Sequence, residues 1–213
     1  MPSSRCWPVT SWAAVDGDGR RKPLWYALRH VYADRLLTVQ PREGALAVVA
    51  VNDSDKPWTG SLAATRTALD GSVLAKETLT LEVAARSTTT LELPAALTTA
   101  GDAAAEVLVV DGAGTRALWF FAEDKDLALS ADLEARAERT DDGYAVHVTA
   151  RALQRDVTVL ADKVDPAAVV DDALVTLLAG ETATFRIRSS MDVDPQAFLA
   201  PAVLRCTNQL VGG

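Results

Sequence analysis

The stretch Glu106-Val107-Leu108-Val109-Val110, then Asp111-Gly112-Ala113-Gly114, then Thr115-Arg116-Ala117-Leu118-Trp119-Phe120-Phe121 decides the fold class of this 213-residue chain. Two runs rich in β-branched and aromatic residues flank a glycine-rich turn, which is typical of two consecutive strands. Gly112-Ala113-Gly114 lacks the third glycine of a dinucleotide motif and no helix follows it, so a nucleotide loop has no support.

The same pattern of short strands and turn residues extends on both sides of this stretch. It predicts a first set of strands, Ala45–Val51, Ser61–Ala68, Val73–Val83, Thr88–Leu93, Glu106–Val110 and Arg116–Phe121. After an interruption at Glu123-Asp124-Lys125-Asp126, a second set follows: Ala131–Arg139, Tyr144–Leu153, Asp156–Ala161, Leu174–Leu178, Thr182–Arg188 and Val203–Asn208. The turn Asp141-Asp142-Gly143 is a hairpin signal.

Six or seven short strands per set indicate a mainly β chain with two tandem immunoglobulin-like β-sandwiches. The opening segment differs, because three of the five tryptophans fall within its first 25 residues. Pro23 suits a first helical position, and Leu24, Leu28 and Val31 recur at i, i+4 and i+7, which predicts a helix over Pro23–Asp34. We divide the chain into a strand-loop-helix unit (1–38), one sandwich (39–126) and a second sandwich (127–213).

Composition excludes several classes of function. The net charge is −8, although residues 1–43 carry seven Lys or Arg against four Asp or Glu. An acidic bulk without a basic stripe argues against nucleic-acid binding. No run approaches the roughly 18 apolar residues of a membrane span, so we expect a soluble, cytoplasmic chain that does not bind membranes. Cys6 and Cys206 fit no zinc pattern; free thiols are the favoured prediction and a disulfide is the alternative.

Side chains suited to catalysis are scarce. His30 lies on the expected helix and His147 in a strand, and neither forms a Ser-His-Asp or Cys-His pattern. The acidic pairs fall in turn-like sequence, which favours solvated loops over a shielded catalytic pair. Asp16-Gly17-Asp18-Gly19 and Asp192-Val193-Asp194 lack the further ligands of a calcium loop. We predict no catalytic residue, no metal and no cofactor. Trp7 is the one residue for which we consider a functional role, because its indole ring could stack on a sugar. Packing with Trp12 and Trp25 in a core is the alternative interpretation.

A resemblance rests on the opening segment. Cys6-Trp7-Pro8-Val9-Thr10-Ser11-Trp12-Ala13-Ala14-Val15-Asp16, followed by Gly19 and by Lys22-Pro23-Leu24-Trp25-Tyr26-Ala27-Leu28-Arg29, resembles the β-mannosidases of glycoside hydrolase family 2. In that family this motif closes the catalytic (β/α)8 barrel. Ala47–Ser54 and Leu118–Glu123 resemble the two immunoglobulin-like domains that follow the barrel.

The resemblance implies a parent enzyme that hydrolyses terminal β-mannosides with retention. The family's acid/base and nucleophile glutamates lie upstream of the tryptophan-rich motif, and no position of this chain corresponds to either. Trp7 matches the tryptophan that lines the sugar subsite at the end of the last barrel strand. Residues 1–38 are then a remnant of the barrel, and the other seven strands are missing.

The start of the likeness is abrupt, because Ser4-Arg5 stand where the family shows Asn-Asp. A truncated gene, a frameshift or a start codon assigned inside a longer frame would each explain it. The main hypothesis is the C-terminal accessory region of a β-mannosidase, inactive alone.

Two other hypotheses compete with it. One is a free-standing carbohydrate-binding or protein-interaction module that uses Trp58 as a loop aromatic; the other is an independent enzyme, for which we find no clustered acid and base. We expect the helix to pack against the first sandwich, and we expect self-association through the exposed barrel remnant or loss of order in residues 1–20.

Overall fold

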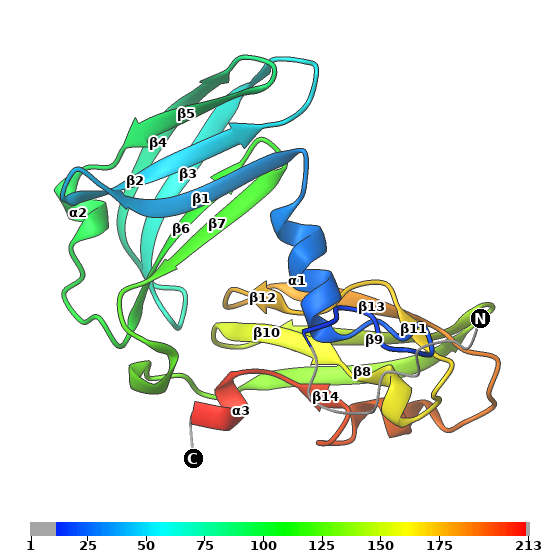
Figure 1. The fold of residues 1–213 in the computed structure, drawn as a ribbon. Coiled ribbons are helices and arrows are strands. Elements are labelled where there is room, and N and C mark those ends of the chain that lie inside the picture. The colour runs from blue at the N-terminus through cyan, green and yellow to red at the C-terminus, as the bar shows by residue number, and fades with distance from the viewer. Residues whose placement is uncertain (1–11, 212–213) are drawn as a thin grey trace.

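The computed structural model describes residues 12–211 and is mainly β, with two β-sandwiches in tandem (Figure 1). Each sandwich pairs a three-stranded with a four-stranded antiparallel sheet. The predicted fold of tandem sandwiches is confirmed. A barrel remnant is not: between Trp12 and the first helix the structure has only a turn and one isolated bridge, Val15 to Arg21. Most of the strand expected before that turn lies outside the described residues.

The first sandwich joins the sheets β1-β2-β5 and β4-β3-β6-β7, the strand arrangement of an immunoglobulin-like Greek key. Its elements are β1 (Arg35–Arg42), β2 (Ala45–Asn52), β3 (Trp58–Ala68), β4 (Val73–Val83), β5 (Ser87–Glu92), α2 (Ala95–Thr98), β6 (Glu106–Gly112) and β7 (Thr115–Phe120).

The geometry of the β6–β7 hairpin explains why this stretch of sequence predicts two consecutive strands. Gly112 pairs with Thr115 across a two-residue turn in which Ala113 and Gly114 both have positive φ, 50° and 84°. That geometry matches the twist of the flanking strands. Gly112 is required for a second reason, because a Cβ there would lie 2.3 Å from the backbone oxygen of Ser61 on β3.

The second sandwich joins the sheets β11-β13-β9-β8 and β12-β10-β14. Its elements are η1 (Asp124–Asp126), β8 (Leu133–Thr140), β9 (Gly143–Ala150), β10 (Gln154–Val159), η2 (Ala161–Lys163), β11 (Val169–Val170), β12 (Val175–Leu177), β13 (Thr182–Arg188), η3 (Pro195–Leu199), β14 (Leu204–Arg205) and α3 (Asn208–Val211). Thr140 pairs with Gly143, which confirms the hairpin at residues 141–143.

The helix α1 (Pro23–Val31) is confirmed as a helix, but its expected packing is wrong. Tyr26, the buried residue of α1, belongs to the core of the second sandwich and not to that of the first. The Tyr26 hydroxyl donates to the Val170 oxygen on β11 at 2.9 Å. The helix therefore precedes the first sandwich in sequence and docks on the second in space.

The strand β1 begins at Arg35, inside the range that we assigned to the opening unit. It was not predicted as a strand, and Pro41 within it explains why, because proline cannot donate to a sheet. The position is tolerated because β1 is an edge strand of its sheet. The division at residues 38 and 126 stays a prediction.

A third apolar cluster joins the two sandwiches. Its buried members come from β6, from the connection between the sandwiches and from the loop between β9 and β10 of the second sandwich: Val107, Val109, Leu127, Leu129 and Leu153. The backbone follows the same junction, because Leu153 N–H donates to the Leu69 oxygen at 2.8 Å and Ala128 N–H donates to the Ala104 oxygen at 2.9 Å. The connection is therefore packed on both sides and does not act as a free linker.

An ion-pair cluster reinforces this junction. Arg116 on β7 binds Asp111 on β6 at 2.5 Å and Glu181 of the second sandwich at 2.7 Å. Hydrogen bonds to Glu181 and then to Asp111 raise the pKa of Arg116 despite its burial. Burial pushes the pKa of Glu181 upward, but bonds from Arg116 and from Leu178 N–H outweigh it, so this pKa lies below its ordinary value of 4.5.

Trp58→Ala should destabilise the first sandwich by about 3–5 kcal/mol, because it removes a large side chain from a packed core. Trp58 is only 1% exposed, and its indole N–H donates to the Ala113 oxygen. The measurement is urea unfolding followed by near-ultraviolet circular dichroism. Trp12→Ala is the control, since Trp12 is 96% exposed, and it should change stability by less than about 0.5 kcal/mol. Equal effects of the two substitutions would contradict this placement of Trp58.

Acid should weaken the junction through Glu181. A carboxyl with a depressed pKa in the folded state stabilises fully above its unfolded pKa, and the contribution is lost as the pH falls through the folded pKa. The Tm of the wild-type chain should therefore drop below about pH 4.5, and Glu181→Gln should remove part of that drop. Glu134→Gln is the control, because Glu134 forms an exposed pair with Arg151. If the Tm of Glu181→Gln falls with pH in the same way as the wild-type Tm, this carboxylate does not have the proposed role.

Candidate functional site

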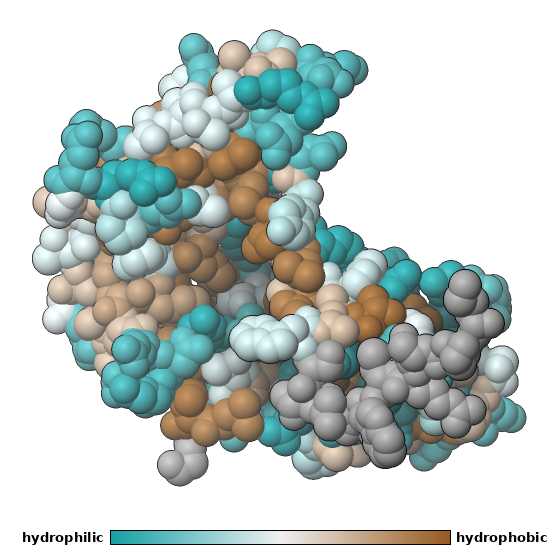
Figure 2. Space-filling model, viewed as in Figure 1, coloured by the Kyte–Doolittle hydropathy of each residue, from teal (hydrophilic) through white to brown (hydrophobic). Residues whose placement is uncertain are grey.

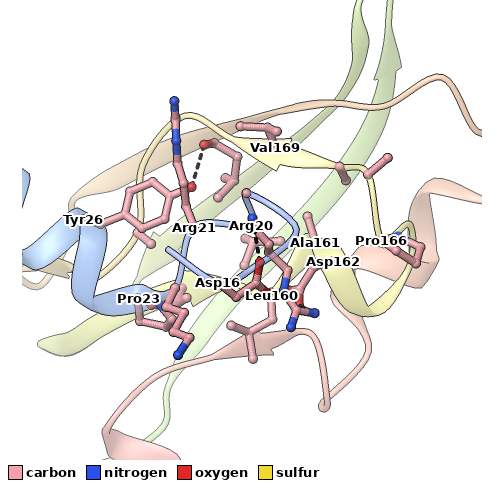
Figure 3. Close-up of a pocket in the computed structure, with 18 of the residues that line it drawn as sticks. Asp16, Arg20, Arg21, Pro23, Tyr26, Leu160, Ala161, Asp162, Pro166 and Val169 are labelled. Carbon is pink, nitrogen blue, oxygen red and sulfur yellow. Dashed lines mark hydrogen bonds and ion pairs between the residues drawn. The ribbon is translucent and has the colours of Figure 1, made fainter. Parts of the chain in front are cut away.

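The predicted sugar contact, Trp7, lies outside the described residues, as does Cys6. Its role stays a prediction. The described part of the same segment is the turn before α1 and the helix itself, and a cavity of about 790 Å³ lies between these residues and the second sandwich. This volume falls within the range of small-molecule sites. Figure 3 shows Asp16, Arg20 and Tyr26 of the opening segment together with Asp162 and Val169 of the second sandwich in the lining of this cavity.

The carboxylate of Asp16 holds the turn before α1 in place. It accepts hydrogen bonds from Asp18 N–H at 3.0 Å, from Arg20 N–H at 2.9 Å and from Arg20 Nε at 2.8 Å. Arg20 also reaches Asp162 Oδ2 at 3.2 Å, so one guanidinium joins both acids. The backbone bond from Arg20 is the largest cause that lowers the pKa of Asp16. An acid held ionised in this way is unsuited to donate a proton near neutral pH.

The aromatic residues beside the cavity are also structural. Tyr26 is 4% exposed, and burial raises the pKa of its phenol against the opposing charges of Arg21 and Arg29. Trp25 meets the Tyr26 ring edge to face, with ring centres 5.0 Å apart, and Arg21 covers the Trp25 ring at 4.1 Å. Neither ring offers an open platform for a sugar.

Asp172 fastens α1 to the second sandwich. Its Oδ1 accepts from Arg29 Nη2 at 2.6 Å, lies 2.8 Å from His30 Nε2 and accepts from Ala173 N–H at 2.8 Å. Arg29 Nη1 also donates to the Asp171 backbone oxygen at 2.8 Å. One of the acidic pairs expected in solvated loops is thus a docking site for the helix.

The other histidine and several of the remaining acidic residues have similar structural partners. His147 lies 2.9 Å from Thr184 Oγ1 through Nδ1 and 2.9 Å from Glu138 through Nε2. Asp194 caps η3 by accepting from Gln196 N–H, and Asp192 pairs with Arg139. Within residues 12–211 no three His, Cys, Asp or Glu side chains are placed to hold a metal ion.

Retaining glycoside hydrolysis needs two carboxyl groups about 5 Å apart, one of them with a raised pKa. The carboxyl pKa shifts resolved for the described part of the chain are all downward. They belong to Asp16, Asp70, Glu106, Glu138, Asp165 and Glu181. In each case hydrogen bonds or cations favour the ionised form, so none of these groups resembles the general acid of a glycosidase.

The alternative use of Trp58 as a loop aromatic is wrong. The sequence Asp55-Lys56-Pro57-Trp58 suggested an exposed turn, but the chain enters β3 at Trp58 and turns the indole into the core. Arg35 covers one side of the ring, with its Cζ 5.8 Å from the ring centre. A carbohydrate-binding module that depends on Trp58 therefore has no surface to use.

By fold, the chain is a tandem immunoglobulin-like β-sandwich protein. No protein-family model matches its sequence, and no curated protein matches it. Among solved structures, the β-D-mannosidase from Dictyoglomus thermophilum is similar, with a TM-score of 0.73 and 21% identity over 94% of this chain and 24% of that protein. The exo-chitosanase CsxA from Amycolatopsis orientalis is also similar, with a TM-score of 0.58 and 16% identity over 92% and 28%.

At these identities the likeness concerns the fold, which this chain shares with parts of two glycoside hydrolases. The chain spans about a quarter of the length of either protein.

In residues 12–211 no helix is long and apolar enough to cross a lipid bilayer.

Asp172→Ala should loosen α1 without unfolding either sandwich. Asp172 and Arg29 are each about 40% exposed, so the loss should be about 1 kcal/mol, or about fivefold faster amide exchange in residues 24–31. Hydrogen exchange read by mass spectrometry measures it. Asp192→Ala removes a more exposed Asp–Arg pair and should leave α1 unchanged. If both variants exchange alike in α1, Asp172 does not fasten the helix.

Proposed function

We propose that this chain is the C-terminal accessory region of a retaining β-mannosidase of glycoside hydrolase family 2, and that it lacks the catalytic carboxylates itself. The observation that carries the proposal is the fold likeness over 94% of the chain to a β-D-mannosidase of which it covers 24%. The tryptophan-rich motif at residues 6–16 points to the same family. The substrate, a terminal β-mannoside, then belongs to the parent enzyme.

The role that we propose for the chain is that of a scaffold. The apolar cluster around Leu153 and the Arg116 ion pairs fix the two sandwiches to each other, and Tyr26 fixes α1 to the second one. A helix held in this way would give a catalytic barrel a rigid attachment. Trp7 would keep its role as a sugar contact within that barrel. A cytoplasmic location is part of the proposal and agrees with the free, buried thiol of Cys206.

The test begins with the DNA upstream of the Met1 codon. We expect an in-frame sequence that encodes the rest of a barrel with two glutamates at strand ends. The full-length product should hydrolyse an aryl β-mannoside, whereas the 213-residue chain should show no turnover above a buffer control. Turnover by the pure chain that is lost on a point substitution within it would disprove the accessory role.

The full-length product also tests Trp7. Trp7→Ala should lower kcat/KM by about two- to tenfold, because an aromatic stacking contact contributes about 0.5–1.5 kcal/mol. Trp12→Ala, at the exposed tryptophan five residues later, is the matched control. Equal kinetics of the two variants would remove Trp7 from the proposed sugar subsite.

A further inference from the structure

The helix α1 has two chemically different faces. The face that carries Tyr26 and Arg29 contacts the second sandwich. With 3.6 residues per turn, Leu24, Leu28 and Val31 lie on the other side of the helix. A surface helix normally turns its apolar stripe toward a core and its charges toward water. In α1 the face with the charged side chain is docked, and the apolar stripe predicted from the sequence points away from the sandwich.

The stripe, defined as Leu24, Leu28 and Val31, is not absorbed by either sandwich. Leu24 is 41% exposed and Val31 54%, and Leu28 is half-buried. None of these three side chains belongs to the hydrophobic clusters of the described residues. The stripe is therefore an apolar surface that the rest of residues 12–211 leaves open.

The outer face of the neighbouring sheet adds to this surface. Side chains alternate along β1, so Leu37 enters the core of the first sandwich and Leu36 lies on the opposite face of the sheet. Leu36 pairs with Val51 on β2, and both are half-buried and outside the core. Figure 2 shows hydrophobic atoms over α1 and over the first sandwich above it on the same side of the molecule.

We propose that the stripe, together with Leu36 and Val51, is the contact surface for the catalytic barrel of the parent enzyme. We call this set of five residues the α1–β1 surface. The inference rests on the proposed function and adds to it the place where the barrel packs. The barrel presents an apolar patch of its own to this surface, and the contact removes Leu24 and Val31 from water.

Two observations favour this occupant. The chain covers 24% of the β-D-mannosidase whose fold it shares, so about three quarters of a parent of that size lies outside it. The stripe begins at Leu24, close in sequence to the end of the chain that would carry the barrel. A partner tethered so near acts at a high effective concentration and can bind through a modest apolar area.

The charges around the helix agree with such a contact. Arg29 is paired with Asp172, and Arg20 with Asp16 and Asp162. A barrel that covers the stripe would therefore not bury these cations without a partner, a situation that would cost several kcal/mol.

Cysteine accessibility tests the proposal in the full-length product and in the 213-residue chain. Leu24→Cys and Val31→Cys should react with a maleimide at least about tenfold more slowly in the full-length product, because a covered thiol reacts only through local opening. Val73→Cys is the control, since Val73 is 62% exposed on β4 and should react equally in both. Mass spectrometry of the labelled peptides separates these sites from Cys6 and Cys206.

Leu24→Glu gives a second readout. In the 213-residue chain it should leave the urea midpoint unchanged, because Leu24 is already partly in water. In the full-length product it should speed thermal inactivation of aryl β-mannoside hydrolysis at least about fivefold, because a carboxylate enters an apolar contact. Val73→Glu should change neither, and circular dichroism checks that the variants are folded. Equal destabilisation of both proteins by Leu24→Glu would overturn the contact.

The outcomes separate this inference from the proposed function. An active full-length β-mannosidase in which Leu24→Cys reacts as fast as in the 213-residue chain would overturn the α1–β1 surface alone. The absence of an upstream barrel would overturn both proposals. Labelling of Leu24→Cys that slows in the 213-residue chain as its concentration rises would assign the surface to a second copy and overturn the barrel contact.

Discussion

The packed junction between the two sandwiches is the constraint on which the rest of the structure depends. Leu127, Leu129 and Leu153 are buried against β6 of the first sandwich, and Arg116 bridges to Glu181 across the same boundary. Because the connection itself supplies part of the apolar cluster, a change in the angle between the sandwiches would expose that cluster to water. Leaving Arg116 or Glu181 without its partner would add a further cost. The two sandwiches therefore behave as one body.

This rigidity explains how α1 can precede the first sandwich and yet dock on the second. The helix runs directly into β1, so its position relative to Val170 and Asp172 is fixed only if the two sandwiches hold their places. The uneven charge of the sequence fits this arrangement, because the basic opening segment meets acids of the second sandwich. The excess of positive charge near the start of the sequence therefore serves ion pairs within the molecule. These pairs join residues more than 140 positions apart in the sequence.

The strands could be predicted well where sequence and local geometry agree. The β6–β7 and β8–β9 hairpins follow from glycines at positions where a Cβ would collide with a neighbouring strand. The prediction failed where tertiary context decides: β1 carries Pro41 at an edge, and Trp58 follows a turn-like sequence but enters the core. For the candidate site, the apolar stripe of α1 was visible in the sequence. The face that docks was not, because Tyr26 and Asp172 show their complementarity only after folding.

The partners of the buried and half-buried acidic residues, and not the number of these residues, bear on function. A glycosidase keeps one carboxyl group protonated at neutral pH by shielding it from cations and donors. This chain does the reverse, since Asp16, Glu106 and Glu181 each have an arginine and backbone N–H groups aimed at them. Such carboxylates lower the free energy of the fold because they are ionised, and making any one of them a general acid would require removing the bonds that hold its loop. The same hydrogen bonds that hold these loops in place therefore make these groups poor general acids.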